Sequence, residues 1–146
     1  MAIWSPAGRL TRILRWAAPP TLVTEKDRSG FLDALRAEAQ PGHEDMQRRM
    51  EEMVEKAQWP RARPAYSSLL PGPGGSLWVK GYQARHETTP GVYQIFDSAG
   101  QWMGALTLPA RFSARQIGDA FILGTWRDPD DVEHVRLYRL AAQGRH

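Results

Sequence analysis

The chain contains no cysteine among its 146 residues, so it forms no disulfide bond, offers no thiolate nucleophile and provides no cysteine ligand for a metal. It also lacks any apolar run near the ~18 residues that a membrane-spanning helix needs, so we expect no membrane span. What it does have is 42% hydrophobic residues, including six tryptophans. This composition is typical of a folded domain and argues against disorder.

Lysine is scarce, with three residues against 16 arginines, and the net charge of +3 is mild. The charge is unevenly distributed, because residues 24–58 hold nine acidic and six basic residues while the remainder is basic. Binding to phosphates needs clustered cations, yet the arginines are scattered and form no Lys/Arg run. We therefore expect no nucleic-acid partner.

The first twenty residues carry Arg9, Arg12 and Arg15 and no acidic residue. This pattern fits an amphipathic targeting peptide or a helix lying on a membrane. It also fits a turn at residues 5–8 followed by a strand over residues 9–16. The arginines interrupt every candidate apolar core of a secretory signal peptide, so the sequence shows no signal peptide and leaves the localisation unknown.

A helical pattern follows. Thr24 and Asp27 resemble a capping box with a shortened acid, and an apolar stripe at helical spacing runs on either side of a break at Pro41-Gly42. The pattern predicts two short helices within residues 24–58. We expect them to cover a rim of the sheets with one apolar side, made by Phe31, Leu35, Met46, Met50 and Met53.

From residue 61 onward the pattern is that of short strands separated by turns. Apolar and aromatic residues concentrate in strand-like segments, and Gly, Pro and Asp concentrate between them. The expected strands are residues 77–82, 92–96, 101–108, 120–126 and 135–140. This spacing predicts an antiparallel β meander.

The meander repeats internally. Residues 77–82 align with 121–126 at an offset of 44, and residues 93–96 align with 135–138 at an offset of 42. Residues 4–10 align with 96–102 at an offset of 92. A period of about 40–45 residues with four strands per unit is typical of β-propeller blades. The repeat favours a strand over the helical alternatives for residues 9–16.

Four segments combine a turn with aromatic strand residues: W-S-P-A-G-R-L-T-R-I-L-R-W, S-L-W-V-K-G-Y, V-Y-Q-I-F-D-S-A-G-Q-W-M-G and I-G-D-A-F-I-L-G-T-W-R-D-P-D-D-V-E-H-V-R-L-Y-R-L. They resemble the C-terminal end of bacterial six-bladed β-propeller proteins of the NHL/TolB-like type, most of which are uncharacterised. The resemblance covers nearly the whole chain, including a charged helical insertion before the penultimate blade. Full-length proteins of this kind are often exported. A six-bladed ring needs roughly 250 residues at this period, so the resemblance implies a fragment or a shortened relative.

The expected fold class is therefore mainly β with a helical insertion. It comprises about two four-stranded antiparallel blades plus one strand of a preceding blade, a partial propeller. We expect residues 1–19 to hold the outer strand of the preceding blade and residues 20–63 the insertion. Residues 64–109 would form the penultimate blade, and residues 110–146 the last blade and a C-terminal tail.

No catalytic, cofactor-binding or metal-binding motif is present. The four histidines have no metal-ligand spacing, the serines lie in no nucleophile elbow, and PGPGG at residues 71–75 lacks the last glycine of a dinucleotide motif. The acidic turn at residues 128–131 lacks the glycine and glutamate of a calcium loop. Trp126, Arg127 and His134 flank this turn and are candidate ligand contacts at a blade rim. The alternative places Trp126 in the core between blades and the other two at the surface.

These observations favour a non-enzymatic propeller module that serves as an interaction or ligand-binding scaffold, with no cofactor and no identified small-molecule ligand. Its expected partners are missing propeller blades or further copies of itself. An alternative is part of a lyase-like or lactonase-like propeller hydrolase whose site lies mostly outside this chain. A further alternative is a membrane-surface binder acting through residues 9–16.

Overall fold

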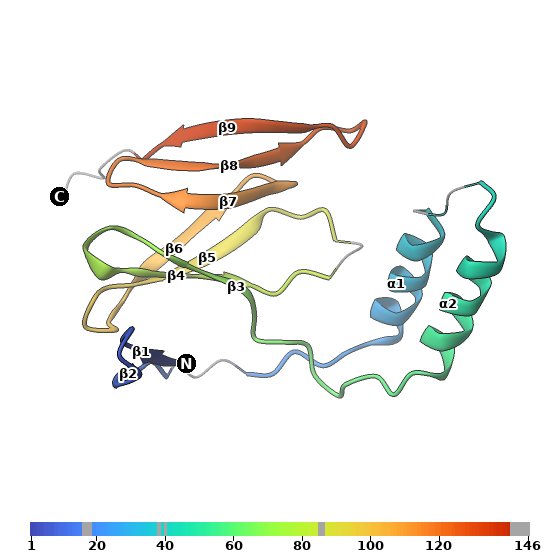
Figure 1. Ribbon diagram of the computed structural model, residues 1–146, viewed down its shortest axis with the longest axis horizontal. Coiled ribbons are helices and arrows are strands. Elements are labelled where there is room, and N and C mark those ends of the chain that lie inside the picture. The colour runs from blue at the N-terminus through green and yellow to red at the C-terminus, as the bar shows by residue number, and fades with distance from the viewer. Residues whose placement is uncertain (16–18, 38, 40, 85–86, 141–146) are drawn as a thin grey trace.

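The computed structural model describes residues 1–15, 19–37, 39, 41–84 and 87–140. Three antiparallel sheets are stacked in layers, and two helices stand to one side of the stack (Figure 1). The helices are α1 (Glu25–Ala37) and α2 (Glu44–Lys56). The strands are β1 (Ala2–Trp4), β2 (Leu10–Ile13), β3 (Tyr66–Pro71), β4 (Leu77–Gly81), β5 (Gly91–Phe96), β6 (Trp102–Leu108), β7 (Phe112–Ile117), β8 (Phe121–Arg127) and β9 (Glu133–Arg139).

Each sheet is a simple meander. The hairpin β1–β2 forms the first layer, the middle sheet has the order β3-β4-β5-β6, and the last sheet has the order β7-β8-β9. The expectation of a mainly β chain with a helical insertion is confirmed, and the described strands close into no barrel. Two details were wrong. The last sheet has three described strands instead of four, and the first layer has two strands instead of one.

Residues 9–16 contain a strand, and the helical interpretations of this segment were wrong as far as the structure describes it. Leu10–Ile13 pairs antiparallel with Ala2–Trp4, and Trp16 lies outside the described residues. Backbone pairing with residues 2–4 satisfies the N–H and C=O groups that a helix would otherwise pair internally. The arginine spacing alone carried no information about this partner strand.

The middle sheet is covered on both faces. One face carries Trp78 and Tyr93, which pack against Phe112 and Ile122 of the last sheet. The opposite face carries Val79 and Phe96, which pack against Leu14, the residue that follows β2. Successive residues of a strand point to opposite faces, so adjacent residues of β4 serve two different cores. We call the face toward the earlier layer the preceding face and the other the following face.

The turns of the hairpins β1–β2 and β5–β6 have the same geometry. In each, the first turn residue, Ser5 or Asp97, donates its N–H to the carbonyl oxygen of the residue four positions later. The residue three positions later, Gly8 or Gly100, donates its N–H back to the first. Both glycines have positive φ, 73° and 85°, which glycine adopts without strain. The turns lie 92 residues apart, which is the offset that the sequence predicts.

The strands beside these turns also share one irregularity. A β-bulge interrupts the first hairpin between Ile3 and Trp4, and a bulge interrupts the second between Ile95 and Phe96. Because the offset of 92 superimposes one bulge on the other, β1–β2 is the structural equivalent of β5–β6. The first layer therefore corresponds to the third and fourth strands of the middle sheet.

The predicted offset of 44 between β4 and β8 was wrong by one residue. Trp78 pairs with Ile95 in the middle sheet, and Leu123 pairs with Leu137 in the last sheet. The offset of 42 takes Ile95 to Leu137, so the equivalent of Trp78 is Leu123, 45 positions later, and not Ile122. A shift of one residue exchanges the two faces of a strand, so the correction decides which side chains point outward.

The two helices form as predicted, with a break at residues 41–42. The N–H of Thr24 donates to Asp27 Oδ2 at 2.7 Å, which is the shortened capping box. Leu35 is buried, and the ring of Phe31 packs edge-on against Trp59 at 5.7 Å between centroids. The apolar side of α1 therefore packs against the segment that follows α2.

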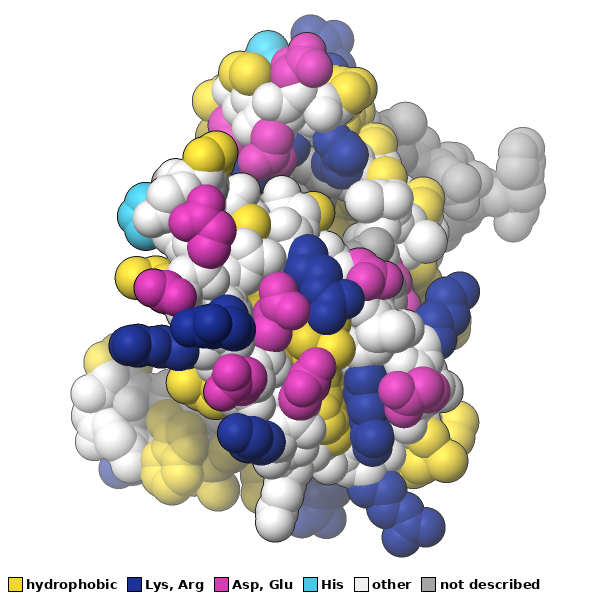
Figure 2. All heavy atoms as spheres, turned by 90° about the vertical axis from the view of Figure 1, so that its right-hand side faces the viewer, with side chains coloured by type: hydrophobic (Ala, Val, Ile, Leu, Met, Phe, Trp, Pro, Cys, Tyr) yellow, Lys and Arg dark blue, Asp and Glu magenta, His cyan; other side chains and the backbone are white. Residues whose placement is uncertain are grey.

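The expectation that the methionines of α2 cover a rim of the sheets was wrong. Met46, Met50 and Met53 are exposed, the last of them to 70%. The helix pairs with α1 instead, through a salt bridge of 3.1 Å between Arg36 and Glu51. Figure 2 shows acidic and basic side chains interspersed on the side of the molecule where the helices stand.

The insertion is attached to the sheets through Arg63. Its guanidinium binds the buried carboxylate of Asp27, at the start of α1, and Glu87 at 3.0 Å in the loop after β4. Backbone pairing between Leu22 and Ala62 holds the two ends of the insertion side by side. The hydrogen bond from Arg63, followed by that from the Thr24 N–H, lowers the pKa of Asp27 to about 2.

This lowered pKa predicts a dependence of stability on pH. The folded-state pKa of Asp27 lies below the ordinary value of 3.8, so its contribution is present above pH 3.8 and is lost as the pH falls toward 2. We expect Asp27→Asn to flatten the pH dependence of unfolding in this window, as measured by intrinsic tryptophan fluorescence. Asp33→Asn, an exposed carboxylate on the same helix, is the control. Identical acid titrations for Asp27→Asn and the wild type would contradict the assignment.

Candidate functional site

The three residues predicted to contact a ligand lie together at the β8–β9 turn. Trp126 and His134 are directly opposite each other on the two strands, with ring centroids 5.8 Å apart. Trp126 packs against the core between the middle and last sheets, and the guanidinium of Arg136 lies 3.4 Å from its ring centroid. The indole is therefore covered on one face by a cation–π contact.

Arg127 and His134 are about half exposed, and each is engaged by carboxylates of the same turn. Arg127 contacts Asp131 at 3.0 Å and Glu133 at 2.9 Å, and these bonds raise the pKa of its guanidinium. His134 Nε2 lies 2.8 Å from Asp128 Oδ2. Contact with His134 is the largest cause that lowers the pKa of Asp128. The arrangement stiffens the turn, and a role for Trp126, Arg127 and His134 in ligand binding stays a prediction.

A polar hollow of about 880 Å³ lies beside this turn. Its wall includes Lys80, Arg111, Arg127 and Asp131, together with residues of the loop after β4. Burial lowers the pKa of Lys80, because a partly buried ammonium group loses hydration. The hollow therefore combines cationic and acidic groups at one end of the sheets, with no dominant sign of charge.

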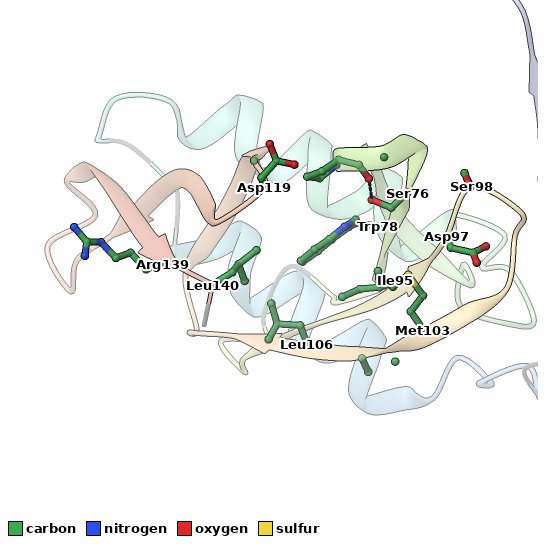
Figure 3. A pocket seen from close by; sticks show the side chains of 15 residues that line it. Ser76, Trp78, Ile95, Asp97, Ser98, Met103, Leu106, Asp119, Arg139 and Leu140 are labelled. Carbon is green, nitrogen blue, oxygen red and sulfur yellow. Dashed lines mark hydrogen bonds between the residues drawn. The ribbon is translucent and has the colours of Figure 1, made fainter. Parts of the chain in front are cut away.

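A second, more apolar groove of about 970 Å³ opens between the middle and last sheets. Figure 3 shows the indole of Trp78 in this groove, with Ile95 and Leu106 of the middle sheet and Leu140 after β9 around it. Asp119 and Arg139 lie at its margin. The groove exposes the following face of β6 where the last sheet does not cover it.

The two equivalent layers bury one leucine to different extents. Leu14, which follows β2, is 3% exposed because Val79 of β4 and Phe96 of β5 pack against it. Its equivalent 92 positions later, Leu106 in β6, is only partly buried against the three-stranded last sheet.

The two ends of the stack carry exposed apolar faces. On the following face of the last sheet, Val135 is 76% exposed and Leu137 is 56% exposed. On the preceding face of the hairpin β1–β2, Trp4 is 60% exposed, with Leu10 and Ile13 beside it, also exposed. These surfaces, which we call the last-sheet face and the hairpin face, are the candidate interaction site. The offset of 44 assigned Leu123 of β8 to the face toward the middle sheet, so sequence analysis missed its place beside Val135 and Leu137 on the last-sheet face.

Among the described residues, no three histidine or carboxylate side chains are grouped so as to hold a metal ion. Neither α1 nor α2 is long and apolar enough to cross a membrane. The chain matches no protein-family model, no curated protein and no solved structure.

Proposed function

We propose that the chain is a stack of β-propeller blades that works as a non-enzymatic interaction scaffold and associates through the uncovered ends of the stack. In this proposal the hairpin β1–β2 is the outer part of one blade. The middle sheet is the next blade, and the last sheet is a blade that lacks its outer strand. The chain would be part of a larger assembly of such blades.

The observation that carries the proposal is the exposure of Val135 and Leu137 on the last-sheet face. Their equivalents in the middle sheet, Tyr93 and Ile95, lie in the core against the last sheet. A β-branched or aliphatic residue at the equivalent of a buried position is expected to be covered in the functional assembly. The recurrence of one turn and one bulge at an offset of 92 supports the repeat on which this comparison depends.

The open edge of the last sheet supports the same proposal. Among the described strands, β9 pairs with β8 alone, so its other edge is a candidate for the addition of a strand. The groove beside Trp78 and Leu106 lies where a strand added to β9 would find an apolar floor. An extended segment would gain backbone hydrogen bonds and apolar burial at the same place.

We expect the wild-type chain to elute at a mass above its 16.5 kDa monomer when size exclusion is coupled to light scattering at micromolar concentration. The double variant Val135→Glu/Leu137→Glu should shift toward the monomer, because a charged carboxylate opposes burial of this face. Met53→Glu, at an exposed apolar position on α2, is the matched control and should leave the mass unchanged. A sharp monomer peak for the wild type would contradict the proposal.

A further inference from the structure

The two contacts between layers obey one rule. The following face of each layer packs on the preceding face of the next layer. In the first contact, Leu14 of the hairpin layer packs on Val79 and Phe96 of the middle sheet. In the second, Trp78 of the middle sheet packs near Ile122 of the last sheet. In the part of the chain that the structure describes, each contact between layers therefore joins the following face of one layer to the preceding face of the next.

The last-sheet face is the structural equivalent of a face that the chain already buries. Strand pairing makes Leu123, Val135 and Leu137 the equivalents of Trp78, Tyr93 and Ile95. In the middle sheet, this following face is covered by the preceding face of another layer. The surface that fits the last-sheet face is therefore a preceding face built from the same kind of hairpin or sheet.

One such preceding face is exposed in the chain itself. Trp4 is the equivalent of Phe96, which is buried against the hairpin layer. Leu10 pairs with Trp4 across the hairpin, and Ile13 is exposed one residue before the buried Leu14. The hairpin face thus carries Trp4 at a position that the middle sheet uses to pack on its predecessor. The equivalents of Leu10 and Ile13 in the middle sheet, Trp102 and Ala105, are exposed, so these two residues add apolar area beside Trp4.

We propose that a second copy of this chain covers the last-sheet face by packing its hairpin face there, head to tail. The inference rests on the proposed function and names the partner of that site. Trp4, Leu10 and Ile13 of one copy meet Leu123, Val135 and Leu137 of the other, which continues the stack across the boundary between chains. Like the two contacts inside the chain, this contact joins a following face to a preceding face.

The geometry of this contact distinguishes it from an ordinary two-fold dimer. A two-fold interface pairs one surface with the same surface of the other copy. Here the two surfaces differ, so each copy keeps one free face of each kind after the first contact. Such a head-to-tail contact generates a closed ring if the rotation between layers closes, and an open filament otherwise.

The absence of cysteine makes a direct test available. Ile13→Cys and Leu137→Cys are prepared as separate chains, one of them with a mass tag, and treated with a short thiol-reactive bismaleimide alone and after mixing. We expect the mixture to give several-fold more cross-linked dimer than either chain alone, and mass analysis should identify it as the mixed dimer. Met53→Cys, exposed on α2, is the control partner for each variant and should give only background cross-linking.

The outcomes separate this inference from the proposed function. The head-to-tail contact is overturned if Leu137→Cys alone gives as much cross-linked dimer as the mixture. It is also overturned if the mixture gives only background cross-linking although the chain associates in solution. Both results leave the scaffold proposal intact. A chain that is monomeric by light scattering overturns both. A second pair, Leu10→Cys with Val135→Cys, replaces the first if circular dichroism shows that either variant is unfolded.

Discussion

Replacing Phe112 with alanine should lower the free energy of unfolding by about 3–5 kcal/mol. Phe112 is buried on β7, and its ring packs edge-on against Tyr138 with centroids 5.0 Å apart. It belongs to the core cluster that also contains Trp78 and Tyr93 of the middle sheet. Truncation would leave a cavity between the two sheets, so the loss is large against a net stability of about 5–15 kcal/mol for a typical domain.

Urea unfolding followed by tryptophan fluorescence measures this effect, because Trp78 and Trp126 both border the core around Phe112. Phe112→Leu retains much of the apolar volume and should be clearly less destabilised. We expect one cooperative transition in the wild type, since the two sheets share this core. An unchanged midpoint for Phe112→Ala would show that the sheets do not depend on the shared core.

The elements that sequence analysis predicted are those with a strong local signal. The helices have apolar spacing, a cap at Thr24 and a break at Gly42. Strands β4, β5, β6, β8 and β9 are rich in aromatic and aliphatic residues between turns. Local pattern sufficed here, because each of these segments carries its own period and its own boundaries.

Two strands at sheet edges, Tyr66–Pro71 and Phe112–Ile117, received no bounds in the sequence analysis. The first ends in a proline and contains two serines, and the second contains Arg115 and Gln116 beside a bulge. Both strands are stabilised by long-range partners. The ring of Phe112 contacts Tyr138, 26 positions away, which no local window contains. Tertiary packing therefore decides these strands, and propensity does not.

Sequence analysis likewise located one part of the candidate site and not the other. Sequence analysis located Trp126, Arg127 and His134 at one turn, and the structure brings them together there. The hairpin face, the last-sheet face and the groove depend on which face each strand turns outward. For β8 that choice rests on a register difference of one residue, which alignment of short apolar segments cannot resolve.

Gly124→Ala is expected to lower the free energy of unfolding by about 1–3 kcal/mol. Gly124 is buried on β8, and a Cβ built there would lie 2.3 Å from the carbonyl oxygen of Ser113 and 2.4 Å from Cζ of Phe112. A ring can rotate away, whereas the carbonyl belongs to the paired strand β7. The methyl group must therefore push two hydrogen-bonded strands apart.

A second variant separates the two clashes. In a Phe112→Leu background the ring contact is gone but the Ser113 carbonyl remains, so we expect Gly124→Ala to stay destabilising, with part of its cost removed. Gly81→Ala is the matched control, because its Cβ would meet the Val92 carbonyl oxygen at an ordinary 3.6 Å. It should be neutral or stabilising by about 0.4–1 kcal/mol, since alanine restricts the unfolded chain. Equal urea midpoints for the two alanine variants would show that close approach of β7 does not restrict position 124 to glycine.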